Sequence, residues 1–309
     1  YFYYNTSDII KLLKNIQINL YNVKLKGRYM KILKSIYENE VEVKEISVLK
    51  SLFIIIMFTL IPGIINFLLT FIMILMDENT SIGSVMIIAG IILIPVHMII
   101  IIMVGKKYTQ KDIIKINDKK VKINNKDFLY VFLIIIGYIL IREAILFDVL
   151  SQFEGPISED DMDFFIDNAE TIEVVIFGFL MYFQTLITAP IFEELLFRGI
   201  ILNGLLNKYK NSSKKAIIYS AMVFGLVHLN IPQGINAFIG GIILGFIYCY
   251  TKSMKLSIFA HFINNLITFV PVPESLIFKF IYIMIGTYVI MKGIKYIRNT
   301  KLINISKAS

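Results

Sequence analysis

The chain has 309 residues, of which 57% are hydrophobic, and its formal net charge is +8 at pH 7. Soluble domains contain about 45–50% apolar residues, and the excess here lies in long runs of Ile, Leu, Phe and Met, which predict a polytopic helical membrane protein. The single cysteine, Cys249, excludes a disulfide framework and a metal site of several cysteines.

The first 50 residues mix lysines and glutamates with apolar positions such as Ile9, Ile10, Leu12 and Leu13. We expect residues 1–50 to form a cytoplasmic amphipathic segment near the inner leaflet, or else a solvated charged extension. They lack the pattern of a signal peptide. The chain begins with a tyrosine and not with Met, which leaves open whether the true N-terminus is present.

Eight apolar segments follow, and they predict an all-α bundle of about eight transmembrane helices. The expected spans are 51–76, 82–104, 128–148, 172–190 continuing to 206, 216–230, 235–250, 256–270 and 276–291. We expect the short spans to lie inside the bundle. The predicted division of the chain is accessory helices in 51–150, an acidic extracytoplasmic loop in 151–170, a membrane core in 171–292 and a basic cytoplasmic tail in 293–309.

The charge of the connections predicts the orientation of the spans. Basic connections are 106–126, 207–215, 251–255 and the tail, whereas 151–170 holds seven acids and no base. Eight spans place the basic and the acidic or neutral connections on opposite sides of the membrane. The positive-inside rule then puts both termini in the cytoplasm. Because the basic charge follows this alternation, we expect a lipid bilayer as the partner and no nucleic acid.

The first polar motif in an apolar setting is Glu193-Glu194-Leu-Leu-Phe-Arg198. A charge at bilayer depth costs about 2.5–3.5 kcal/mol on insertion scales. Glu194 and Arg198 are four residues apart on one helical face, so we expect an ion pair between them. Glu193 projects about 100° away and is left for another partner. We also expect Pro190 to kink the helix just before the glutamates.

Two further motifs, Phe224 to His228 and His261 to Asn265, repeat the four-residue spacing. Counted from the nearest lysines at about 1.5 Å per residue, Glu193 and His228 lie roughly 20 Å deep. By the same count His261 and Asn265 lie about 9 and 15 Å deep. The motifs therefore predict a shared cavity that opens to the cytoplasm.

These residue types suit two kinds of chemistry. A carboxylate beside an imidazole can activate water as a general base, and an imidazole with a carboxamide can hold an oxyanion. Alternatively, Glu193, His228 and His261 could be the protein ligands of a catalytic zinc. The cofactor is thus none or zinc. Asn264 is a polar rival of Asn265, and we interpret His97 as structural.

The three motifs, in this order on successive spans, resemble the CPBP (CAAX protease and bacteriocin-processing) family of intramembrane endopeptidases, also called ABI or Rce1-like. The resemblance covers about 170–270. It implies that Glu193 and His228 activate the water, with Glu194 in the same motif, and that His261 and Asn265 stabilise the oxyanion. The family has been described both as metalloproteases and as metal-independent glutamic proteases; the absence of a His-Glu-x-x-His motif favours the latter here.

The resemblance implies hydrolysis of a peptide bond in a peptide or membrane-associated protein. The Lys-, Ile- and Asn-rich composition indicates a bacterial plasma membrane, where prenylated substrates are not expected. Processing of a pheromone, bacteriocin or small membrane protein would fit. The alternatives are a non-enzymatic scaffold or bacteriocin self-immunity protein of the same fold, and a transporter with a proton relay. The absence of internal repeats disfavours the transporter.

Overall fold

The computed structural model describes residues 29–76, 81–109, 123–150, 170–270, 273 and 275–306. The predictions for residues 1–28, for the acidic loop 151–169 and for most of the lysine-rich connection between 106 and 126 lie outside those ranges. Within them the chain is helical, and its one extended pairing is an isolated antiparallel bridge between Val43 and Thr109.

Each predicted span is found as a helix. The helices are α3 (Val48–Met76), α4 (Ile82–Tyr108), α5 (Asn125–Ile145), a continuous helix from Thr171 to Lys208, α11 (Ser213–Leu226), α12 (Ile231–Thr251), α13 (Met254–Ile267) and α14 (Leu276–Ser306). Two short helices, α2 (Tyr29–Tyr37) and α6 (Phe147–Leu150), accompany them. The last helix runs well beyond the predicted end at residue 291.

Six of these helices are long and apolar enough to cross a membrane. The other two, α11 and α13, have 14 residues each. A helix of that length spans only about 21 Å, which is less than the ~30 Å of a hydrocarbon core. They are also the two helices whose ends or faces carry the histidine motifs. Each of them contacts several other helices, as expected for short segments that lie inside the bundle.

The helix from Thr171 to Lys208 changes its hydrogen-bonding pattern along its length. It consists of α8 (Thr171–Phe183), the π-helical turn η3 (Gln184–Thr188), α9 (Ala189–Glu194), the π-helical segment η4 (Leu195–Leu202) and α10 (Asn203–Lys208). The expected kink site, Pro190, follows η3, and the helix continues through it. The two π-helical segments bracket Glu193 and Glu194. Such segments are rare and often occur at functional sites.

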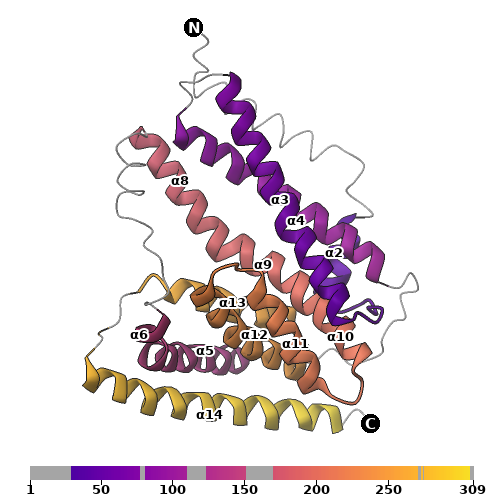
Figure 1. The fold of residues 1–309 in the computed structure, drawn as a ribbon. Coiled ribbons are helices and arrows are strands. Elements are labelled where there is room, and N and C mark those ends of the chain that lie inside the picture. The colour runs from indigo at the N-terminus through magenta and orange to yellow at the C-terminus, as the bar shows by residue number, and fades with distance from the viewer. Residues whose placement is uncertain are drawn as a thin grey trace.

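Figure 1 shows how these helices are grouped. The helices α3 and α4 run beside the long helix that contains α8, α9 and α10, while α5 and α14 form a pair on the other side of the molecule. Between these groups lie α11, α12 and α13, which contact η4, α5 and α14. The middle layer therefore brings α13 directly against α9, the helix that carries the two glutamates.

Large apolar side chains cover much of the outer surface. Exposed examples on α3, α8 and α14 include Phe67, Phe71, Phe179, Phe280 and Tyr288. An apolar exterior of this extent fits a lipid environment and would be a liability in water. Together with the six candidate spans, it marks the chain as an integral membrane protein.

Part of the predicted N-terminal segment, residues 29–47, packs against the core. Ile36 is 1% exposed and packs directly on Gly199 of the long helix. A Cβ added at Gly199 would lie only 2.4 Å from the Ile36 side chain. Ile46 is fully buried, and its backbone N–H donates to the carbonyl of Gly204 at 3.0 Å. This stretch is therefore part of the folded protein and not a solvated extension.

The same stretch covers the turn between α12 and α13. Asn39, with a left-handed φ of 54°, donates from Nδ2 to the carbonyl oxygen of Lys252 at 2.8 Å. The hydroxyl of Tyr248 donates in turn to Asn39 Oδ1 at 2.5 Å. The turn residues Thr251 and Ser253 are buried beneath these contacts.

Glycines allow a close helix contact between α5 and α14. A Cβ added at Gly137 would lie 2.7 Å from the carbonyl oxygen of Gly286, and a Cβ at Gly286 would lie 2.7 Å from that of Gly137. Membrane helices pack through such small residues because lipid provides no hydrophobic drive between them. On α12, neighbouring side chains lie within 3.2 Å of the Cβ positions of Gly241 and Gly245.

We predict that Gly286→Val lowers the thermal stability of the purified protein. The added side chain meets the backbone of α5, and overpacking of this kind typically costs about 1–3 kcal/mol. The matched control is Gly63→Val on α3, where nothing lies within 4 Å of the added Cβ. Thermal unfolding in detergent, followed by the reaction of a thiol dye with Cys249, should show a clear drop for the first variant alone. Equal unfolding temperatures would contradict the proposed close contact.

Candidate active site

The carboxylate of Glu194 is the centre of a buried hydrogen-bond cluster. Its Oε1 accepts from Arg198 Nη1 at 2.7 Å and lies 2.9 Å from His261 Nδ1, and its Oε2 accepts from Ser257 Oγ at 2.5 Å. The Glu194 side chain is 0% exposed. A buried carboxylate is tolerated only when its charge is paired and its oxygens are hydrogen-bonded, and both conditions are met here. The predicted ion pair between Glu194 and Arg198 is confirmed.

Arg198 links this cluster to two further helices. Its Nη2 donates to the carbonyl of Gly241 on α12 at 3.3 Å, and its guanidinium carbon lies 4.9 Å from the ring centroid of Phe224 on α11. Its side chain is only 1% exposed. One guanidinium therefore fixes the long helix, α11 and α12 relative to one another.

His261 presents its second ring nitrogen to the other glutamate. Because Nδ1 faces the carboxylate of Glu194, we assign the proton to Nδ1, which leaves the lone pair of Nε2 free. That Nε2 lies 3.7 Å from Glu193 Oε2. The Glu193 side chain is 19% exposed, and its carboxylate accepts no hydrogen bond from any described residue. The two adjacent glutamates thus differ: Glu194 is saturated and buried, and Glu193 is accessible.

His228 lies in the turn after α11 and not within a helix as its spacing suggests. Its Nδ1 is 3.1 Å from the carbonyl oxygen of Phe224, and its ring meets that of Phe224 edge-on at 5.3 Å. His261 meets the same ring at 5.8 Å. Phe224 is therefore a shared neighbour of both histidines. Within the described residues, the imidazole that contacts Glu193 is that of His261.

Asn265 connects α13 to the π-helical turn η3. Its Nδ2 donates to the carbonyl of Thr185 at 2.9 Å, and its Oδ1 accepts from Asn264 Nδ2 at 3.2 Å. The expected grouping of Asn265 with His261 is present in the sense that both lie on one face of α13. In this structure, however, the carboxamide of Asn265 is engaged in holding η3.

The depth estimated for His261 is wrong. The counts from the lysines place it about 11 Å nearer the membrane surface than Glu193, yet His261 Nε2 and Glu193 Oε2 lie 3.7 Å apart. The count assumes that α13 begins at the interface. Its first residues, Met254 and Leu256, are instead buried, because residues 29–47 cover the turn before them.

The zinc alternative requires three ligands around one point. Among the described residues, no three His, Cys, Asp or Glu side chains are grouped so that they could hold a metal ion. The set considered from the sequence, Glu193, His228 and His261, is not grouped in this way: Nε2 of His261 lies 3.7 Å from Glu193 Oε2, whereas the contacts of His228 are with Phe224. The donor set does not fit a metal here, so we derive no step through one.

Two features of the site were missed from the sequence. Ser257, which is fully buried and donates to Glu194, lies four residues before His261, so the same spacing argument could have found it. The second feature is an apolar groove of about 260 Å³ beside the cluster. Its lining comes from α5, the long helix and α13, and consists of Phe128, Leu186, Ile187, Ile191, Lys255, Ile258, Phe259 and Phe262.

Comparison with known proteins finds a family model and a relative that each match part of the chain. A family model described as "Type II CAAX prenyl endopeptidase Rce1-like" matches residues 175–267, which contain the whole cluster. The chain is also similar to the protein named "Putative membrane peptidase YdiL" from Bacillus subtilis (strain 168), with 34% identity over 95 residues. That match covers 31% of this chain and 37% of the relative. No solved structure matches the chain.

We predict that Arg198→Met strongly destabilises the protein, because it leaves the buried charge of Glu194 without its partner. Removing one member of a buried ion pair typically costs about 3–5 kcal/mol. The control is Lys34→Met, which breaks a pair of the same i, i+4 spacing whose side chains are 70% and 30% exposed. Chemical or thermal unfolding in detergent would measure both. If the two variants unfold alike, the cluster does not depend on Arg198.

Proposed function

We propose that this protein is an intramembrane endopeptidase of the CPBP family that hydrolyses a peptide bond in a peptide or membrane-associated protein. The match of residues 175–267 to the Rce1-like family model and the similarity to a putative membrane peptidase support this proposal. The observation that carries the proposal is the row of three groups, Glu194, His261 and Glu193, in the bundle interior. The fully hydrogen-bonded carboxylate of Glu194 orients the imidazole of His261, which in turn faces the accessible carboxylate of Glu193. This arrangement suits the activation of water.

In the proposed reaction Glu193 is the general base. A water molecule that hydrogen-bonds to both Glu193 Oε2 and His261 Nε2, at ~2.8 Å from each, is geometrically compatible with their 3.7 Å separation. As the water oxygen forms a bond to the carbonyl carbon of the substrate, Glu193 accepts a proton from that water. The carbon–nitrogen bond then breaks, and the proton passes to the leaving amine.

Glu194 acts in this scheme as a positioning residue. Its hydrogen bond to Nδ1 fixes the ring plane and the tautomer of His261, so that Nε2 faces Glu193. Ser257 and Arg198 hold Glu194 in turn. The charge of Glu194 is already compensated by Arg198, which favours Glu193 as the group that exchanges a proton.

The roles of the two histidines are the part of the proposal that differs from the sequence-based expectation. The resemblance pairs Glu193 with His228, whereas the distances favour His261 as the partner of Glu193. Since Nδ1 of His228 faces a backbone carbonyl, its Nε2 is also free to exchange a proton. We assign to His228, once Nε2 has also taken up a proton and can donate, the stabilisation of the oxyanion or leaving group from beside Phe224. Asn265 contributes by holding η3 against α13.

The groove between α5, the long helix and α13 suggests which part of a substrate binds first. Its lining is almost entirely aliphatic and aromatic, and Ile191 and Ile258 lie within three residues of Glu193 and His261 along their helices. An apolar side chain of a membrane-associated peptide would fit there and bring the next peptide bond toward the cluster. We propose a bacterial plasma membrane with both termini in the cytoplasm as the setting, on the basis of the basic connections.

We predict that Glu193→Gln and His261→Gln each lower the rate of cleavage of a fluorogenic apolar peptide by about 10²–10⁴-fold. Glu193→Gln should leave the unfolding temperature unchanged because this side chain is partly exposed. The control is His97→Gln on α4, a histidine whose Nδ1 bonds the carbonyl of Leu93 and whose ring packs on Phe58, away from the cluster.

The same assay distinguishes the histidines and the rival functions. If His228→Gln lowers the cleavage rate more than His261→Gln does, His228 and not His261 is the catalytic partner of Glu193. Loss of cleavage with a chelator and recovery with zinc would replace the metal-free scheme. If the wild type cleaves nothing while Glu193→Gln keeps full biological activity in cells, the protein is a scaffold or immunity protein of the same fold.

A further inference from the structure

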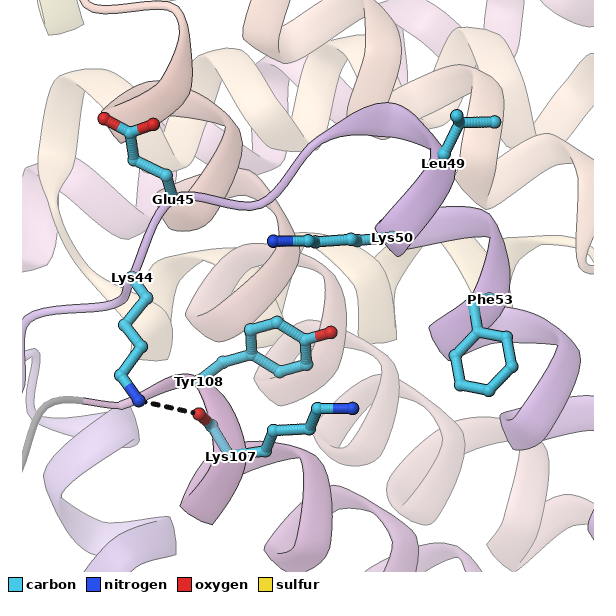
Figure 2. Close-up of a pocket in the computed structure, with 7 residues that line it drawn as sticks. All are labelled: Lys44, Glu45, Leu49, Lys50, Phe53, Lys107 and Tyr108. Carbon is cyan, nitrogen blue, oxygen red and sulfur yellow. Dashed lines mark hydrogen bonds between the residues drawn. The ribbon is translucent and has the colours of Figure 1, made fainter.

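A second pocket lies at the end of the bundle where the basic residues gather. Its volume is about 570 Å³, and none of the residues of the Glu194 cluster lines it. Figure 2 shows its lining, which comes from the segment before α3, the first turns of α3 and the end of α4: Lys44, Glu45, Leu49, Lys50, Phe53, Lys107 and Tyr108.

Three lysines and the ring of Tyr108 line this pocket. Lys44 Nζ donates to the carbonyl oxygen of Lys107 at 3.1 Å, and Lys107 Nζ lies 5.6 Å from the ring centroid of Tyr108. Lys50 extends from α3 across the pocket (Figure 2). The one acid of the lining, Glu45, lies 3.7 Å from Lys208 outside it. The interior of the pocket therefore has an excess of positive charge.

The start of α3 adds to this positive potential. The helix begins at Val48, and the backbone N–H of Lys50 donates to Ser47 Oγ. Other N–H groups of a first helical turn have no partner within the helix and favour an anion. A pocket with lysines and a helix N-terminus on its wall is suited to an oxygen-rich anion such as a phosphate group.

The outer rim of the pocket is apolar. Leu49 is 78% exposed and Phe53 is 55% exposed, and the exposed surface of α3 continues along Ile56 and Leu60. Since α3 is a candidate membrane span, this rim would face acyl chains. The site thus has cationic groups inside and a lipid-facing aliphatic and aromatic surface outside, which is the amphipathic pattern of a phospholipid and not that of a free anion.

We propose that this pocket binds the headgroup phosphate of an anionic phospholipid, with the acyl chains lying along α3. The lysines neutralise the phosphate, and the rim residues pack on the first methylenes of the chains. Lys44 lies two residues before Ile46, whose backbone N–H donates a hydrogen bond to the carbonyl of Gly204 in the long helix. A bound lipid would therefore also secure the docked N-terminal stretch. The proposal depends only on a membrane setting and does not depend on peptidase activity.

The test uses the full-length protein purified in detergent, titrated with single lipids and followed by native mass spectrometry. Phosphatidylglycerol should bind, phosphatidylcholine should bind at least about tenfold more weakly, and soluble glycerol 3-phosphate should not compete. Lys50→Gln combined with Lys107→Gln should weaken binding of phosphatidylglycerol by about tenfold or more. The corresponding double arginine variant should retain it.

The matched control is Lys214→Gln combined with Lys215→Gln, which removes two exposed lysines at the start of α11, outside the pocket. It should leave lipid binding unchanged. If this control loses as much binding of phosphatidylglycerol, net charge alone explains the effect and the proposal is overturned. Competition by glycerol 3-phosphate would also overturn it, in favour of a site for a soluble anion. Lipid-free unfolding temperatures of all variants confirm that they are folded.

Discussion

The carboxylate of Glu194 has no access to water, and most of the site is arranged to satisfy it. Three donors from two helices reach its two oxygens, and none of them is an ordinary packing residue of an apolar bundle. An unsatisfied carboxylate in a low-dielectric interior is costly, and both oxygens of Glu194 have donors here. The contacts from Ser257 and His261 hold α13 against the long helix and set where His261 points.

The accessible glutamate is a consequence of the buried one. Neighbouring residues on a helix diverge by about 100°, so when Glu194 is directed into the bundle its neighbour must leave that direction. The π-helical segments on both sides of the pair widen the helix locally and change the faces presented before and after it. The short helices α11 and α13 then close around the pair without having to cross the bilayer themselves.

Much of this could be predicted from the sequence, because hydrophobic runs and four-residue spacings are local signals. The helices, the membrane setting and the pairing of Glu194 with Arg198 all follow from such signals. What could not be predicted depends on contacts between distant segments. The α12–α13 turn is buried under Asn39, and His261 lies beside Glu193. The periodicity of α13 indicates neither contact. Ser257 is different, since its spacing from His261 was visible and was not used.

The docked stretch of residues 29–47 has a consequence for how the molecule is assembled. Asn39 bonds the backbone of a residue 213 positions later, and Asn207 bonds the carbonyl of Val43 across 164 positions. A ribosome releases the early stretch long before its partners exist, so it must wait, undocked, while the later helices are inserted. Residues 29–47 can therefore reach their final position only after Gly204 and Lys252 have been synthesised, and the turn before α13 is covered only then.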